Sequence, residues 1–186
     1  MHCPIMLWMT SRSRSSMVAA IFAAHGVHWG EVQQQSAGYD TFENQKVKGI
    51  LKKHFGLPFC TFPESKQDAL TEIFGVVPHD RVWMMKTGVE YFKVFQPLTP
   101  FNVFIVRDPK AVAKSLCDKN PGARREVALE AAEWRFQQMR ILHQQNGGVW
   151  VDTDRVIAGD LTQIREALEY CGILYDEAKT KRAIHK

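Results

Sequence analysis

Short apolar runs, each followed by a polar turn and a helical pattern, recur along this chain, and their alternation constrains the fold more than any other feature. The runs occupy residues 4–9, 81–85, 102–106 and 149–151. They are short and do not alternate between apolar and polar residues, which is typical of strands buried on both faces. Such strands, separated by helices, predict an α/β fold with a three-layer parallel β-sheet flanked by helices.

The predicted helices cover residues 15–25, 42–55, 65–74, 124–146 and 160–170, and all of them end at glycines. These glycines suit the left-handed position that commonly follows a helix. A short last helix begins after Asp176, and residues 29–41 are expected to form a substrate-facing loop. With 186 residues, 45% of them hydrophobic, the chain is long enough to build one core, so we expect a single domain over residues 1–186.

Charge and cysteine content exclude several classes of function. Lys and Arg total 24 against 20 Asp and Glu, and this net charge of +4 suits an anionic ligand without indicating nucleic acid. The four cysteines are far apart and predict no metal site, while Cys117 and Cys171 are expected to be buried free thiols of a cytoplasmic protein. The apolar run at residues 4–9 is too short for a signal-peptide core or a membrane span, so we expect no membrane partner.

The first chemical feature is the hydroxyl-rich basic segment Thr10-Ser-Arg-Ser-Arg-Ser-Ser16, which joins the first predicted strand to a helix. Backbone N–H groups at a helix N-terminus favour an anion, and serine hydroxyls and guanidinium groups add donors. The segment therefore predicts a phosphate or sulfate site, although a solvated loop in which Ser15 only caps the helix is the alternative. It has no glycine and no Lys before the final hydroxyl pair, which disfavours an ordinary ATP-binding P-loop.

The second chemical feature is Arg107, which follows a predicted strand and precedes Asp108-Pro109. Pro109 suits the first turn of a helix, so Ser115 falls about two turns along it and can converge with Arg107 on one anion. The alternative is that Arg107 pairs with Asp108 or covers a sheet edge.

Together the two segments resemble the nucleotide-binding motifs of the sulfotransferases. The residues that match the family's 5′-phosphosulfate loop are, in order, Arg12, Ser13, Arg14, Ser15 and Ser16. Arg12 stands where the cytosolic branch has Lys, and Arg14 stands where Gly is usual, so its side chain is expected to point away from the cofactor. Arg107 and Ser115 match the family's 3′-phosphate motif.

The resemblance implies a P-loop NTPase-like (sulfotransferase) fold that binds 3′-phosphoadenosine 5′-phosphosulfate (PAPS) and releases PAP. The enzyme it implies transfers a sulfuryl group to a hydroxyl or amine of a small-molecule or glycan acceptor. Two other functions stay open: a P-loop nucleoside or nucleotide kinase, and a nucleotide-binding relative without catalysis. The acceptor and the oligomeric state do not follow from the sequence.

Sulfuryl transfer requires a base for the acceptor's proton and cations for the charge that develops on the leaving phosphate. Arg12 is the expected cation, and Lys86, at the end of its predicted strand, could hold the sulfuryl group. Glu43, in the first turn of a predicted helix, is the first choice of base, although a carboxylate there also fits a merely structural role. The remaining candidates are Glu31 and three histidines, His25, His28 and His79.

Overall fold

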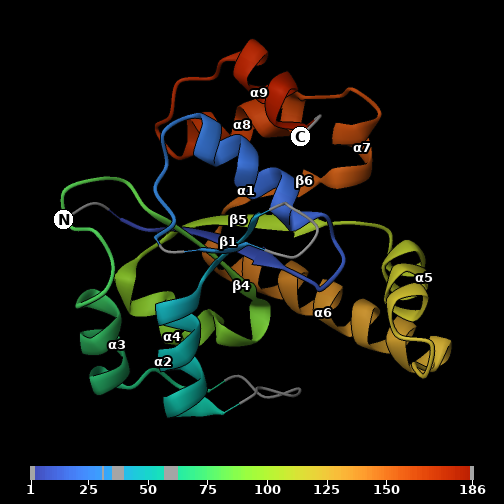
Figure 1. Ribbon diagram of the computed structural model, residues 1–186, viewed down its shortest axis with the longest axis horizontal. Coiled ribbons are helices and arrows are strands. Elements are labelled where there is room, and N and C mark those ends of the chain that lie inside the picture. The colour runs from blue at the N-terminus through green and yellow to red at the C-terminus, as the bar shows by residue number, and fades with distance from the viewer. Residues whose placement is uncertain (1–2, 31, 35–39, 57–62, 185–186) are drawn as a thin grey trace.

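A four-stranded, all-parallel sheet with the strand order β4-β1-β5-β6 forms the centre of the protein (Figure 1). The computed structural model describes residues 3–30, 32–34, 40–56 and 63–184. The four strands are β1 (Ile5–Met9), β4 (Met84–Gly88), β5 (Phe101–Val106) and β6 (Val149–Asp152). A separate antiparallel pair consists of β2 (Val32–Gln34) and β3 (Asp40–Asn44).

Helices cover both faces of the sheet and complete three layers (Figure 1). On one face lie α1 (Ser15–Ala24), α8 (Thr162–Tyr170) and α9 (Glu177–Ile184), and on the other lie α2 (Gln45–Phe55), α3 (Gln67–Phe74), α4 (Phe92–Phe95) and α6 (Arg125–Asn146). Two more helices, α5 (Pro109–Lys119) and α7 (Thr153–Ile157), follow β5 and β6 closely. The predicted class, a parallel sheet flanked by helices, is confirmed.

Strand β1 shows why its sequence does not alternate. Ile5 and Leu7 pack into the core on the α1 side, whereas Met6 and Trp8 pack into the core on the α2 side, and all four are fully buried. Successive side chains of a strand point to opposite faces, so a strand covered on both sides needs apolar residues at every position. Burial of each large apolar side chain contributes about 1.5–3 kcal/mol, which fixes β1 at the centre of the sheet.

Strand β4 differs from the prediction, because it covers Met84–Gly88 instead of residues 81–85. Lys86 therefore lies inside the strand, opposite Leu7, and not at the strand's end. The polar pair Lys86-Thr87 resembles the start of a turn, but the hydrogen bonds of a parallel ladder come from the backbone and tolerate polar side chains. A polar residue after an apolar run therefore does not mark the end of a strand.

The predicted helix over residues 42–55 also begins later, at Gln45. Asn44 caps it, since its Oδ1 accepts a hydrogen bond from the backbone N–H of Val47 at 3.1 Å. Residues 40–44 form β3, so Glu43 lies in a strand and not in the first turn of a helix. Within the predicted loop at residues 29–41, residues 32–34 instead form β2 and residues 40–41 begin β3.

Other boundaries shift by a few residues. Gly75 ends α3 in a right-handed conformation (φ −67°) and not in the predicted left-handed one, whereas Gly147 after α6 has φ 69°. Asp160 accepts a hydrogen bond from the backbone N–H of Thr162 at the start of α8, and Asp176 does the same for Lys179 in α9. Within the described part of the chain, no helix combines the length and apolar character needed to cross a membrane.

Candidate functional site

The loop of residues 10–14 joins β1 to α1 at the carboxyl edge of the sheet. Arg12 (φ 67°) and Arg14 (φ 59°) both have left-handed backbones, which cost a residue other than glycine roughly 1–2 kcal/mol each. The backbone N–H of Ser13 donates to the Thr10 carbonyl, and that of Met17 donates to the Arg14 carbonyl. The left-handed backbone at Arg14 gives a physical reason why glycine is usual at that place in the motif.

The serines of this loop lie at or next to the N-terminus of α1. Ser13 is fully buried, and its Oγ is the one buried side-chain N or O atom among the described residues without a hydrogen-bond partner. Ser15 is 6% exposed, and Ser16 Oγ accepts a hydrogen bond from Lys86 Nζ at 2.9 Å. The structure thus brings Lys86 to the loop, although Lys86 lies in the middle of β4.

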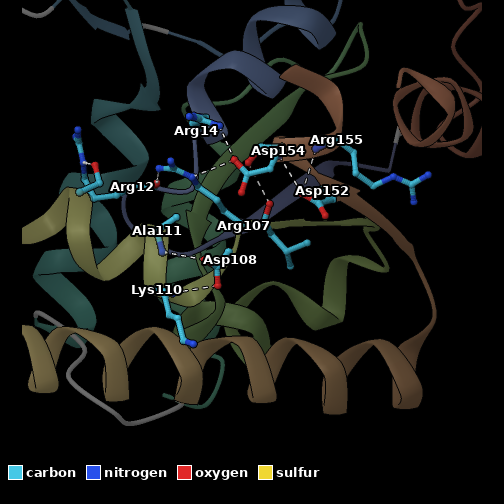
Figure 2. A network of polar contacts seen from close by, with 12 residues as sticks. Arg12, Arg14, Arg107, Asp108, Lys110, Ala111, Asp152, Asp154 and Arg155 are labelled. Carbon is cyan, nitrogen blue, oxygen red and sulfur yellow. Dashed lines mark hydrogen bonds and ion pairs between the residues drawn. The ribbon is translucent and has the colours of Figure 1, made fainter. Parts of the chain in front are cut away.

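The Arg107 segment meets the same loop from the next strand. Arg107 Nη1 donates to the Arg12 carbonyl at 3.3 Å, and Arg12 Nε donates to Ser115 Oγ at 3.2 Å (Figure 2). Arg12, Arg107 and Ser115 therefore form one network, with Ser115 on α5. Two segments that are separate in the sequence meet because β1 and β5 are neighbours in a parallel sheet.

Asp108 does not pair with Arg107. Its two carboxylate oxygens accept hydrogen bonds from the backbone N–H groups of Lys110 and Ala111, and Pro109 occupies the first position of α5 (Figure 2). This capping leaves the Arg107 side chain, which is 15% exposed, to other partners.

The partner that the sequence reasoning missed is Asp154. Its Oδ1 accepts hydrogen bonds from Arg14 Nη1 at 2.5 Å and from Arg107 Nε at 3.3 Å (Figure 2). Asp154 lies in the first turn of α7, which Asp152 caps by accepting from the backbone N–H of Asp154 at 2.9 Å. The run Val151-Asp-Thr-Asp154 after a buried strand was the available signal, since the carboxyl ends of parallel strands meet at one edge.

The structure describes the surroundings of some of the candidate bases. Strand β3, which carries Glu43, packs against α1 and β4, while Glu31 lies outside the described residues. His25 has a structural role, because its Nδ1 donates to the Ile21 carbonyl and its Nε2 accepts from the backbone N–H of Asp176. His79 stacks on Phe74.

No cluster of three or more His, Cys, Asp or Glu side chains that could hold a metal ion occurs in the described ranges. Cys171 is buried and Cys117 is half-buried, as free thiols. Burial raises the pKa of the Cys171 thiol to about 12, so this residue is inert near neutral pH.

The four-stranded, all-parallel sheet flanked by helices matches the sulfotransferase fold, and this chain has that fold. It is similar to mouse sulfotransferase SULT7A1 complexed with PAP (TM-score 0.59, 9% identity), with 98% of this chain and 63% of the mouse chain covered. It is also similar to the sulfotransferase domain of the curacin biosynthetic pathway (TM-score 0.61, 11% identity), with 98% of this chain and 78% of that domain covered. Sulfotransferase STF1 from Mycobacterium tuberculosis H37Rv is similar as well (TM-score 0.57, 12% identity), with 100% of this chain and 71% of the STF1 chain covered.

These identities are low, so the likeness concerns the fold. No protein-family model matches the sequence, and no curated protein matches it. The chain spans less than two thirds of the length of the mouse enzyme.

Proposed function

We propose that this protein is a sulfotransferase that transfers the sulfuryl group of PAPS to a hydroxyl or amine acceptor. The observation that carries the proposal is the contact between Arg12 Nε and Ser115 Oγ at 3.2 Å, across 103 residues of sequence. It joins the loop that resembles a 5′-phosphosulfate site to the motif that resembles a 3′-phosphate site. The likeness of the fold to a mouse sulfotransferase solved with PAP supports the same ligand.

The residues present fit such a nucleotide. The buried Ser13 hydroxyl has no partner, and an unsatisfied buried polar group costs about 1–3 kcal/mol, which an acceptor oxygen on a bound anion would remove. The loop offers this hydroxyl, the N-terminus of α1 and the cations Arg12 and Lys86 to the 5′ side. Arg107 and Ser115 would hold the 3′-phosphate. Arg14 donates to Asp154 and is not assigned a role in binding a phosphate.

Bound PAPS would supply an activated sulfuryl group and a phosphate leaving group. In this proposal Arg12 and Lys86 stabilise the negative charge that develops at the transfer site, where fixed cations act more strongly than in water. Lys86 is 6% exposed, and its ammonium group is fixed by Ser16. Glu43, on the strand that packs against β4, would take the proton from the acceptor hydroxyl or amine.

Calorimetric titration of the purified protein with PAP, ADP and ATP, each with and without Mg²⁺, tests this function. Because one set of charge-assisted hydrogen bonds contributes about 1.5–3 kcal/mol, PAP should bind roughly ten- to a hundredfold more tightly than ADP, without Mg²⁺. Tight Mg²⁺-dependent ATP binding would instead identify a kinase. PAP binding without transfer from PAPS to any acceptor in a broad screen would identify a binding protein without catalysis.

A further inference from the structure

A hollow of about 240 Å³ lies between α2 and the strands β1 and β4, beside Lys86. Its inner wall is apolar: it consists of Met9 at the end of β1, Leu51 on α2, Met85 on β4 and the ring of Tyr91. Leu51 and Met85 are 2% and 3% exposed, so these side chains are held in place by the core. A site of this size fits a compact ligand, and methionine side chains adapt to rings and short chains alike.

The hollow is positively charged. Lys48 and Lys52 lie four residues apart on α2, which places them on one side of the helix, and Lys86 lies on the strand beneath. None of the described residues that line the hollow carries a carboxylate. Lys48 and Lys52 are both exposed, whereas Lys86 is buried. The apolar wall is therefore bounded by two solvent-accessible cations on one side and by a buried cation on the other.

Lys86 joins this hollow to the loop after β1, because its Nζ donates to Ser16 Oγ at 2.9 Å. A polar group of a ligand placed at Lys86 would thus lie next to the N-terminus of α1. Tyr91 does not compete as a base: burial, followed by the nearby Glu90, raises the pKa of its phenol, so it stays protonated near neutral pH. Its hydroxyl donates to the Gly56 carbonyl.

From this arrangement we infer that the hollow binds the acceptor, and that the acceptor is a small amphipathic anion. Its apolar body packs on Met9, Leu51 and Met85, its reacting hydroxyl lies at Lys86, and a carboxylate or similar anionic group is bound by Lys48 and Lys52. This inference rests on the proposed sulfotransferase function, and it adds the charge and size of the acceptor.

Three matched probes test it without any turnover: 3-(4-hydroxyphenyl)propionate, its neutral amide, and the cationic amine tyramine. Calorimetry on the native protein should give a dissociation constant about three- to tenfold lower for the carboxylate than for the amide, which is the range expected for exposed ion pairs. Tyramine should have the highest dissociation constant of the three probes. This preference should shrink as salt is raised. Equal affinities for the carboxylate and the amide would overturn the inference.

The double variant Lys48→Gln/Lys52→Gln should lose the preference for the carboxylate while binding the amide as before. The matched control is Lys46→Gln/Lys53→Gln, which removes the same charge from the same helix at residues that do not line this hollow. If the control removes the preference equally, the effect is one of overall charge and the inference fails.

The methionines report where the probe binds. With methyl-labelled methionine, the carboxylate should shift the NMR signals of Met9 and Met85 but not that of Met139, which is fully buried on α6. Shifts confined to other methionines would overturn the inference.

PAP titrations of the same proteins separate this inference from the proposed function. PAP binding that is unchanged in Lys48→Gln/Lys52→Gln, together with a lost carboxylate preference, supports both. PAP binding without any carboxylate preference in the native protein refutes only the acceptor class. Absence of PAP binding refutes the sulfotransferase function and, with it, the role of the hollow as an acceptor site.

Discussion

Replacement of Asp154 by Asn gives the sharpest test of the nucleotide site. Asp154 Oδ1 accepts hydrogen bonds from both Arg14 and Arg107 (Figure 2), so one carboxylate neutralises part of the charge that the 3′-phosphate is expected to use. Asparagine keeps one side-chain oxygen as an acceptor for both arginines, removes the negative charge and replaces the other carboxylate oxygen with an NH2 group. We predict that Asp154→Asn binds PAP more tightly than the native protein.

The magnitude follows from Coulomb's law. A phosphate on the remaining N–H groups of Arg107 would lie about 7 Å from the Asp154 carboxylate, and the repulsion between a near-dianion and this charge is about 1–2 kcal/mol at an effective dielectric constant of roughly 40–80. We use a value near the water limit because the Asp154 side chain is 41% exposed. Since about 1.4 kcal/mol corresponds to a factor of ten, PAP affinity should rise about five- to thirtyfold.

Calorimetric titration with PAP and ADP at two salt concentrations measures this effect. ADP has no 3′-phosphate, so its affinity should change less than about threefold, and the gain for PAP should shrink as salt screens the charges. Asp80→Asn is the matched control, because Asp80 is an exposed carboxylate paired with Arg81 before β4. Weaker PAP binding in Asp154→Asn would refute the predicted repulsion and would mean that Asp154 positions Arg107. An equal gain in affinity for ADP would show a general effect of charge.

The remaining predictions concern the other residues of the site and the core. Arg107→Ala should weaken PAP binding about ten- to a hundredfold and leave ADP binding nearly unchanged, with a smaller effect for Ser115→Ala; parallel losses for both ligands in the titration would mean that Arg107 supports the fold. Glu43→Gln should slow single-turnover transfer from PAPS about a hundredfold while PAP affinity stays within about threefold, and full activity would exclude Glu43 as the base. Lys86→Ala should also slow this transfer, and Lys86→Arg should restore only part of it, because a planar guanidinium does not replace a point charge. Cys171 should resist iodoacetamide at pH 8 in the folded protein, since the pKa of its buried thiol is about 12, and peptide mass spectrometry would detect any modification.

Local sequence was sufficient for the fold class and for the positions of the serine- and arginine-rich loop after β1 and of Arg107 after β5. The run at residues 4–9 is apolar at every position because both faces of β1 are covered, and this pattern is visible without a structure. Pro109 after Arg107 likewise fixed the start of α5 and therefore the place of Ser115, two turns along it. These features depend on residues that are neighbours in the sequence and on burial, which the hydrophobic pattern indicates.

The boundaries that failed are those at which tertiary contacts overrule local preference. Lys86 looks like a residue that ends a strand, yet β4 continues to Gly88 because its backbone pairs with β1. Glu43 looks like the first turn of a helix, yet Asn44 caps α2 one residue later and residues 40–44 pair with β2. Strand β1 is far from β4 in the sequence, and the pairing of β2 with β3 is irregular because its register shifts between Val32 and Gln34, so neither pairing follows from the local pattern.

The sequence by itself determined that a parallel sheet would carry a serine- and arginine-rich loop after its first strand and an arginine after a later one. Only the tertiary structure decided that Asp154 lies between Arg14 and Arg107, and that Lys86 lies between Ser16 and an apolar hollow bordered by the lysines of α2. The physical reason is that periodicity and capping report the environment of each segment separately. Which charges meet depends on strand order and register, and these are set by the packing of the whole sheet.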